Sequence, residues 1–375
     1  MADVTLAPPR VSAARLDPAS AHPDAPAGLP AGRSGRATPP RTARASGPLP
    51  TASGRRRYTL VVAGLIGLAV LITIGSLAWA NPMPVGSPGF WLIAEMRATN
   101  LAVIAVVACA QAFATVAFQT VTGNRILTPS IMGFESLYRV VQTAAVFVLG
   151  GTGVAAVTGL VPFLAQVALM VAFATLLYGW LFSGRNSSLH VTLLVGIILG
   201  AGLGAIATFM QRLLTPSEFD VLTARLIGSI ATAQTSYLWV AVPIVAVVCA
   251  VLWLRSGTLN VLGLGRAAAV NLGVDHRRQT LIVLVLTAVL MAVSTALVGP
   301  MTFLGFLVAM LAYQLSDTYC HRRIFPVAAL VGFVVLAGAH LLLKHVFYAE
   351  GSVGIIIELV GGSFFLIHLL RKGRL

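Results

Sequence analysis

Long uninterrupted apolar stretches are the feature that most restricts how this chain can fold. From residue 58 onward, runs of about 18–25 residues carry few or no charges, which is the length a helix needs to cross a bilayer. The chain is 58% hydrophobic and 10% charged, with a mean hydropathy of +0.91. Barrel strands would alternate apolar and polar residues, and these runs do not alternate. We therefore expect an all-α polytopic membrane protein.

Ten such runs predict about ten transmembrane helices. Lys and Arg gather on the cytoplasmic side of membrane proteins. With the N-terminus in the cytoplasm, 20 of the 25 Lys and Arg fall in cytoplasmic segments and four fall outside. Both termini are therefore expected in the cytoplasm of a multi-pass protein of the inner (cytoplasmic) membrane. The predicted spans lie near 59–80, 98–121, 131–150, 156–183, 190–214, 236–254, 278–298, 302–315, 325–343 and 353–370.

Residues 1–57 differ in composition from the ten-helix domain expected over 58–375. They are rich in Ala, Pro, Arg, Ser and Gly, and they hold too few large apolar side chains to fold alone. We expect a disordered basic cytoplasmic tail, with binding of its arginines to lipid or to a partner as the alternative. The excess of 25 Lys and Arg over 11 Asp and Glu is attributed to topology and membrane lipid, and no nucleic-acid partner is expected.

Sequence motifs for catalysis are missing. A nucleotide-binding loop of the Walker type needs Gly-Lys followed by Ser or Thr, and neither Lys344 nor Lys372 follows a glycine. The three cysteines lie far apart, and a His340–His345 pair alone is a weak metal signal. We therefore expect no enzyme activity, no cofactor and no metal site in this chain.

The stretch from Arg255 to Arg278 is too apolar for an ordinary solvated loop. Its glycines divide it into turns around a short helix near 266–272, and a short amphipathic helix needs a partner for its apolar face. We expect residues 259–275 to dock against another protein, whereas a helix lying on the membrane surface is the alternative. The residues expected to make this contact are Leu262, Gly263, Leu264, Gly265, Ala268, Leu272 and Gly273.

Several polar residues fall within the predicted spans. Glu135 and Arg139 are four residues apart, so they share a helix face and can pair. Glu358 lies five residues into the last span. Ionisable groups at membrane depth are costly and point to function, but structural pairing explains these residues equally well.

Five segments, in order, resemble those of the iron-chelate and vitamin B12 permeases of ATP-binding cassette (ABC) importers, the FecCD type. NRILTPSIMGFESLY (124–138) and FMQRLLTPSEFDVL (209–222) resemble the branch for catecholate siderophores most closely. LNVLGLGRAAAVNLGVD (259–275) resembles the cytoplasmic segment that seats in the ATPase subunit. GPMTFLGFLVAMLA (299–312) and GIIIELVGGSFFLIHLLRKG (354–373) resemble the family's corner and closing span.

The resemblance implies a permease domain over 58–375 that moves ferric-siderophore complexes by alternating access. It implies two copies of an ATP-binding subunit, a second permease that is either another copy or a related chain, and an extracytoplasmic siderophore-binding lipoprotein. It also implies docking of that lipoprotein at Arg97, with Lys344 sharing the role. The alternatives are a transporter driven by an ion gradient, or a permease for another chelate such as cobalamin or haem.

Overall fold

A computed structural model describes most of the chain after the first 48 residues. The described residues are 49, 52–79, 81–157, 159–183, 189–230, 233, 235–346 and 352–372. All of them belong to one compact unit, 45–375. The predicted tail therefore lies outside the described residues, except for residue 49 and for 52–57, which form the first turns of a helix.

Each of the ten predicted spans lies on a helix. Seven helices are long and apolar enough to cross a membrane, an eighth span results if α7 and α8 count as one pair bent by 60°, and α11 and α13 are shorter apolar helices. The ten are α1 (Ala52–Ala78), α2 (Pro88–Thr122), α3 (Phe134–Ala156), α4 (Leu160–Ser183), α5 (Leu189–Gln211), α7 (Leu238–Leu254), α10 (His276–Val298), α11 (Leu304–Ser316), α12 (His321–His345) and α13 (Val353–Lys372). The expectation of an all-helical polytopic membrane protein is confirmed.

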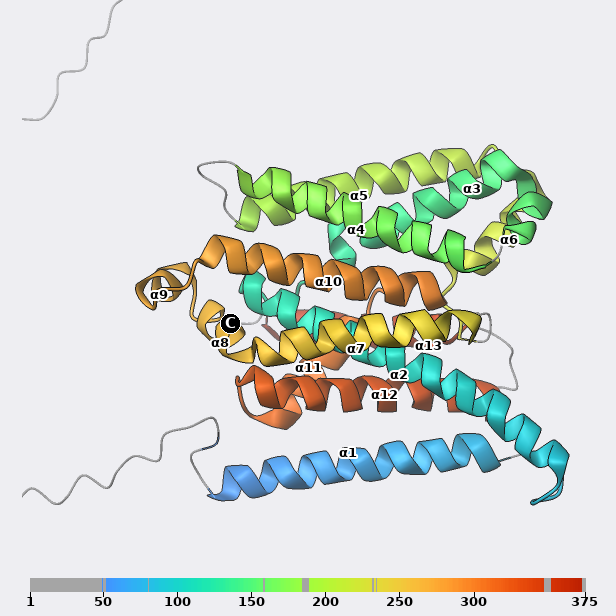
Figure 1. The fold of residues 1–375 in the computed structure, drawn as a ribbon, viewed down its shortest axis with the longest axis horizontal. Helices are drawn as coiled ribbons and strands as arrows, with labels where there is room; N and C mark the ends of the chain where they lie inside the picture. The colour runs from blue at the N-terminus through green and yellow to red at the C-terminus, as the bar shows by residue number, and fades with distance from the viewer. Residues whose placement is uncertain are drawn as a thin grey trace, which may run out of the picture. The chain divides into compact units, whose positions relative to one another are not determined.

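Short helices lie at the two ends of this bundle. The segment between α7 and α10 forms α8 (Ser256–Leu262) and α9 (Arg266–Asn271) at one end, and α6 (Pro216–Leu226) lies at the opposite end (Figure 1). We call these the α9 end and the α6 end. Two 3₁₀ turns, Pro129–Met132 and Thr235–Tyr237, complete the described elements.

Helix α2 runs through the centre of the bundle and is its most buried long helix. It packs against α10 on one side and α12 on another. Its alanines let neighbouring backbones approach closely, as small residues do between membrane helices. A Cβ on Gly332 of α12 would lie 3.2 Å from the Ala108 carbonyl oxygen, and Phe113 of α2 stacks on Phe325 of α12 at 4.3 Å. The α2–α12 pair is therefore a closely packed unit.

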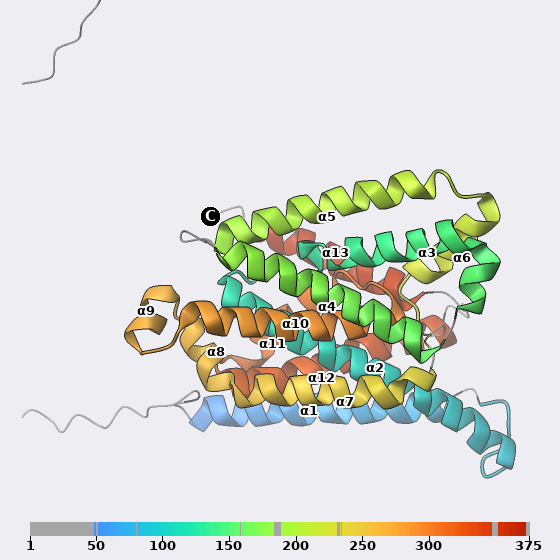
Figure 2. The ribbon, with the colours of Figure 1, turned by 45° about the horizontal axis from the view of Figure 1, so that its top comes forward.

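Helix α1 lies at one side of the bundle and α5 at the opposite side, in both views (Figures 1 and 2). α1 packs mainly on α12, and most of its side chains are exposed. At the α9 end, the Tyr58 hydroxyl donates to the Arg323 carbonyl at 3.2 Å, and Arg57 pairs with Asp317 at 3.0 Å.

The chain between α2 and α3 turns back into the bundle instead of remaining at its surface. Gly123 and Gly133 both have positive φ, +62° and +92°, and they end α2 and start α3. A Cβ on Gly133 would lie 3.2 Å from the Cα of Gly200, which is midway along α5. Helix α3 therefore begins beside the middle of the α5 span.

Candidate functional site

The segment predicted to dock against another protein is folded and held at both ends. Arg255, at its start, donates from Nη1 to Oε1 of Gln279, at its end, over 2.8 Å. The predicted short helix is confirmed as α9, whereas α8 was not predicted. We call residues 255–279 the α8–α9 segment.

The inner face of this segment is apolar and buried. Leu259 and Leu262 of α8 and Ala269 of α9 have almost no exposed surface. α8 packs against both α2 and α12, so these side chains fix it to the core. Leu262 is therefore an anchor of the segment and is not available at its surface, whereas Ala268 is half-buried.

The outer face of the segment is also apolar, and it is exposed. Leu264, Val270 and Leu272 are 66%, 56% and 61% exposed. Three large aliphatic side chains within nine residues form the kind of patch that marks an interaction site. Gly263, Gly265 and Gly273, from the predicted set, are exposed beside them.

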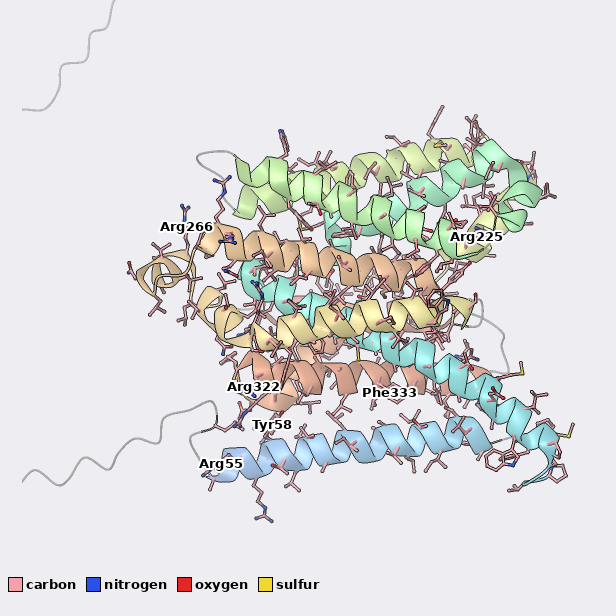
Figure 3. All side chains as sticks on the ribbon, in the orientation of Figure 1. Arg55, Tyr58, Arg225, Arg266, Arg322 and Phe333 are labelled. Atoms are coloured by element: carbon pink, nitrogen blue, oxygen red, sulfur yellow. The ribbon has the colours of Figure 1, made fainter. Side chains whose placement is uncertain are left out.

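Two glycines set the shape of this surface. Gly265 has φ +92° and starts α9, and Gly273 has φ +77° and ends it. Residues with a Cβ rarely adopt these angles, so glycine is required at both turns. The turns bring Arg266, Arg277 and their neighbours around a hollow. Figure 3 shows Arg266 at this end and Arg225 at the other. The hollow is lined by Arg266, Val270, Gly273, Val274, Asp275, His276 and Arg277.

The α9 end carries arginines stacked on aromatic rings. Arg125 lies 4.8 Å from the ring of Tyr313 and 4.7 Å from that of Tyr319. Arg322 lies 5.0 Å from the ring of Trp253. Basic and aromatic side chains of this kind gather where helices leave the bilayer, so this end lies at a membrane interface.

The two residues predicted to dock a binding protein lie near the opposite end. Arg97 of α2 donates from Nη1 to the carbonyls of Ser76 and Trp79, at 3.1 and 2.7 Å, and so caps the end of α1. His345 lies with Nε2 3.2 Å from the same Trp79 carbonyl. Lys344, its neighbour, is exposed. The structure therefore brings Arg97 and Lys344 to one corner, with Arg97 already bound to the backbone.

At the same end, the short helix α6 follows the fifth span. The Thr215 backbone N–H and hydroxyl both donate to Glu218 Oε2, at 2.9 and 2.8 Å, which fixes the first turn. Both hydrogen bonds lower the pKa of Glu218, and the one from the Thr215 backbone N–H has the larger effect. Gly228, just after α6, has its carbonyl bonded to the Gly354 N–H at 2.9 Å, so α6 is tied to the start of α13.

Glu135 and Arg139, which four-residue spacing allows to pair, do not form a salt bridge. Glu135 is buried, and Oε2 accepts a hydrogen bond from the Thr302 hydroxyl at 2.6 Å. Arg139 is exposed instead, as is Glu358 on α13. In the part of the chain that the structure describes, the only ion pair is Arg57 with Asp317.

No metal centre is found where the structure allows a search. Among the described residues there is no group of three or more His, Cys, Asp or Glu side chains that could hold an ion. Cys109, Cys249 and Cys320 are free thiols, each half-buried.

Known proteins match almost the whole of the bundle. Residues 58–371 match the FecCD transport family. The petrobactin import system permease protein FatC of Bacillus anthracis is 46% identical over 317 residues, covering 84% of this chain and 90% of that protein. The petrobactin import system permease protein YclO of Bacillus subtilis is 34% identical, covering 85% and 99%.

More distant proteins match over the same part of the chain. The hemin transport system permease protein HmuU of Yersinia pestis is 29% identical, covering 85% of this chain and 98% of that one. A solved structure described as a metal-chelate type ABC transporter in an inward-facing conformation has a TM-score of 0.71 at 22% identity, covering 84% and 99%. At that identity the likeness shows the fold.

Proposed function

The chain belongs to the FecCD transport family, and from this premise we propose that it carries ferric petrobactin, or a closely related ferric catecholate, inward through the cytoplasmic membrane. It is a multi-pass permease subunit of an ABC importer for iron–siderophore complexes and is not an enzyme. The observation that supports petrobactin is the identity to two petrobactin permeases, which exceeds the identity to the hemin permease.

The proposed topology has ten spans with both termini in the cytoplasm. The ten predicted runs all lie on helices, and the last of these, α13, has 20 residues. The basic excess at the α9 end, with its stacked arginines, supports placing that end in the cytoplasm. The α6 end is then extracytoplasmic.

The proposed contact with the ATP-binding subunit is the outer face of the α8–α9 segment. Leu264, Val270 and Leu272 supply apolar area, and the glycine turns at 265 and 273 set its shape. Arginines beside the patch favour an acidic rim on the partner. We propose Leu264, Gly265, Leu272 and Gly273 as direct contacts, with Gly263 and Ala268 beside them and Leu262 as the anchor below.

The proposed transport pathway runs along the side of the bundle that exposes Arg139 and Glu358. An uncovered charge inside a span costs about 2.5–3.5 kcal/mol against lipid, so such residues face water or protein. Arg139 lies four residues beyond Glu135 in α3, a helix that begins beside the middle of α5. We propose that a second permease subunit covers this side and encloses the pathway.

The corner that holds Arg97 and Lys344 is proposed to receive the siderophore-binding lipoprotein. Lys344 is exposed and can meet an acidic group directly. Arg97 holds α1 in place through the carbonyls of Ser76 and Trp79, and its part in docking acts through the position of that corner.

Uptake of labelled iron in cells that lack this chain tests the proposal. Loss of uptake from ferric petrobactin, with uptake from ferric hydroxamate, hemin and cobalamin unchanged, is expected. Restoration by the cloned chain is the control. Unchanged petrobactin uptake together with lost hemin or cobalamin uptake would contradict the proposed cargo. Uptake that continues without any ATP-binding subunit would contradict the importer.

A further inference from the structure

A buried histidine joins the α8–α9 segment to the centre of the bundle. His321 is the first residue of α12 and is almost fully buried. Its Nδ1 lies 2.6 Å from Oδ1 of Asn260 in α8, and its Nε2 lies 2.6 Å from the Thr120 hydroxyl in α2. One imidazole on α12 thus contacts α8 and α2, through residues 61 and 201 positions away along the chain. Neither His321 nor Asn260 carries a sequence signal of its own.

The backbone fixes the direction of these hydrogen bonds. The His321 main-chain N–H donates to the same Asn260 oxygen at 3.0 Å, so the atom facing the histidine is the amide oxygen. Because that oxygen can only accept, Nδ1 must carry a proton. In the neutral ring Nε2 is then the acceptor, so the single proton of the Thr120 hydroxyl is shared between Nε2, at 2.6 Å, and the Val116 carbonyl, at 2.8 Å.

Thr120 also lies next to the α8–α9 segment at Gly263. Its methyl group would lie 3.5 Å from a Cβ on Gly263, which is the residue after α8. Asn260 in turn extends its amide nitrogen toward Cys320 Sγ at 3.8 Å, on the residue before α12. The end of α2, the start of α12 and α8 are therefore joined by side chains at a single point.

We infer that Asn260, His321 and Thr120 are positioning residues that make α8 move as one body with the α2–α12 pair. This rests on the proposed function, in which a partner acts on the outer face of the segment. The network lies on the opposite, inner side, so it carries motion inward without touching that partner. Hydrogen bonds are directional, and they hold the angle of α8 more closely than Leu259 and Leu262 could alone.

A purely structural role makes a different prediction from a transmitting one. If the network only satisfies buried polar groups, its loss lowers the stability of the complex and leaves the cargo moved per ATP unchanged. If it transmits motion, its loss lowers the cargo moved per ATP, while assembly and ATP hydrolysis persist.

The test uses the whole complex, purified from its host through a tag on this chain and reconstituted in liposomes. Thr120→Val replaces only the hydroxyl and keeps the methyl group near Gly263, and Thr120→Ser keeps the hydroxyl. Asn260→Ala removes the acceptor. Thr175→Val is the control, because Thr175 is an exposed residue of α4 whose hydroxyl donates only to the Val171 carbonyl.

Ferric petrobactin moved per ATP hydrolysed is the readout. We expect it to fall about five-fold in Thr120→Val and in Asn260→Ala, as the loss of one hydrogen bond predicts, and to hold in Thr120→Ser and Thr175→Val. The double variant with Thr120→Val and Asn260→Ala should lower the cargo moved per ATP little further than either single substitution. An unchanged ratio in Thr120→Val overturns the inference, whether or not the melting temperature falls. If the wild-type complex shows no ATP-dependent uptake, the proposed function itself is contradicted, before any variant is compared.

Discussion

The Thr302 hydroxyl donates to Glu135 Oε2 over 2.6 Å, and this bond joins the corner between α10 and α11 to the first turn of α3. Both partners lie inside the bundle, and they are 167 residues apart in the chain. The bond holds the start of α3 against the rest of the core.

Removing the Thr302 hydroxyl should destabilise the protein. Thr302→Val leaves the buried Glu135 carboxyl without this donor, at a cost of about 1–3 kcal/mol, whereas Thr302→Ser keeps the donor. The melting temperature of the purified complex should fall for valine and hold for serine. Equal melting temperatures for the two variants would contradict the assignment.

Charge on the outer face of the α8–α9 segment should uncouple hydrolysis from uptake. Leu264→Asp places a carboxylate on an exposed side chain, so the protein should insert normally and lose its contact with the ATPase. Leu262→Asp is the matched variant, because Leu262 is buried and its replacement should deplete the folded protein. Gly273→Asp should act like Leu264→Asp, with added strain from its positive φ. Membrane abundance and iron uptake, measured together, separate the outcomes; normal uptake by both exposed-site variants would count against the contact.

The closest approach between α11 and α2 should not tolerate a methyl group. A Cβ on Gly305 would lie 2.2 Å from Thr115 Oγ1, so Gly305→Ala should cost about 1–3 kcal/mol. Thr115→Ala removes that oxygen and should restore part of the loss in the double variant. Gly64→Ala, with nothing within 4 Å, is the control. Thermal unfolding in detergent measures the stability of the two single variants, the double variant and the control. A Gly305→Ala protein as stable as wild type would show that α11 can move away from α2.

The exposed arginine of α3 should matter for an anionic cargo. Ferric catecholates carry net negative charge because their ligand oxygens are deprotonated. Arg139→Gln should therefore lower uptake several-fold without changing membrane abundance, and Arg139→Lys should retain most of it. Full uptake by the glutamine variant would remove Arg139 from the pathway.

Substitutions of Arg97 and Lys344 should affect different properties of the protein. Lys344→Glu reverses an exposed charge and should weaken binding of the lipoprotein, more so at low salt. Arg97→Gln removes the cap of α1 and should lower the melting temperature first. Titration of the lipoprotein against the purified permease at two salt concentrations measures the first effect.

Local patterns predicted the helices well and their mutual contacts poorly. Apolar length located ten helices, and the glycines around 266–272 located α9. Helix α8 was missed because Ser256, Gly257, Thr258 and Asn260 favour a loop locally; only the burial of Leu259 and Leu262 makes the helix stable. The start of α2 at Pro88 was missed because Glu95 and Arg97 interrupt the apolar run, although Ser87 followed by Pro88 is a helix-start signal.

Contacts between distant segments account for the other differences. Glu135 takes Thr302 as its partner instead of Arg139, which four-residue spacing had favoured. His321 meets Asn260 and Thr120 only after three helices have packed. Helix periodicity identifies residues that lie close together on one helix. It gives no information about contacts between residues far apart in the chain, such as Glu135 with Thr302 or His321 with Asn260.

If a second permease subunit covers Arg139 and Glu358, as proposed, this chain depends on that neighbour for part of its stability. A chain with uncovered charges at membrane depth gains free energy from whatever covers them, so its folded lifetime rises with the supply of its neighbour. Unequal production of the subunits would then lower the amount of the surplus chain through proteolysis, and cells would keep the ratio of subunits balanced without a dedicated regulator.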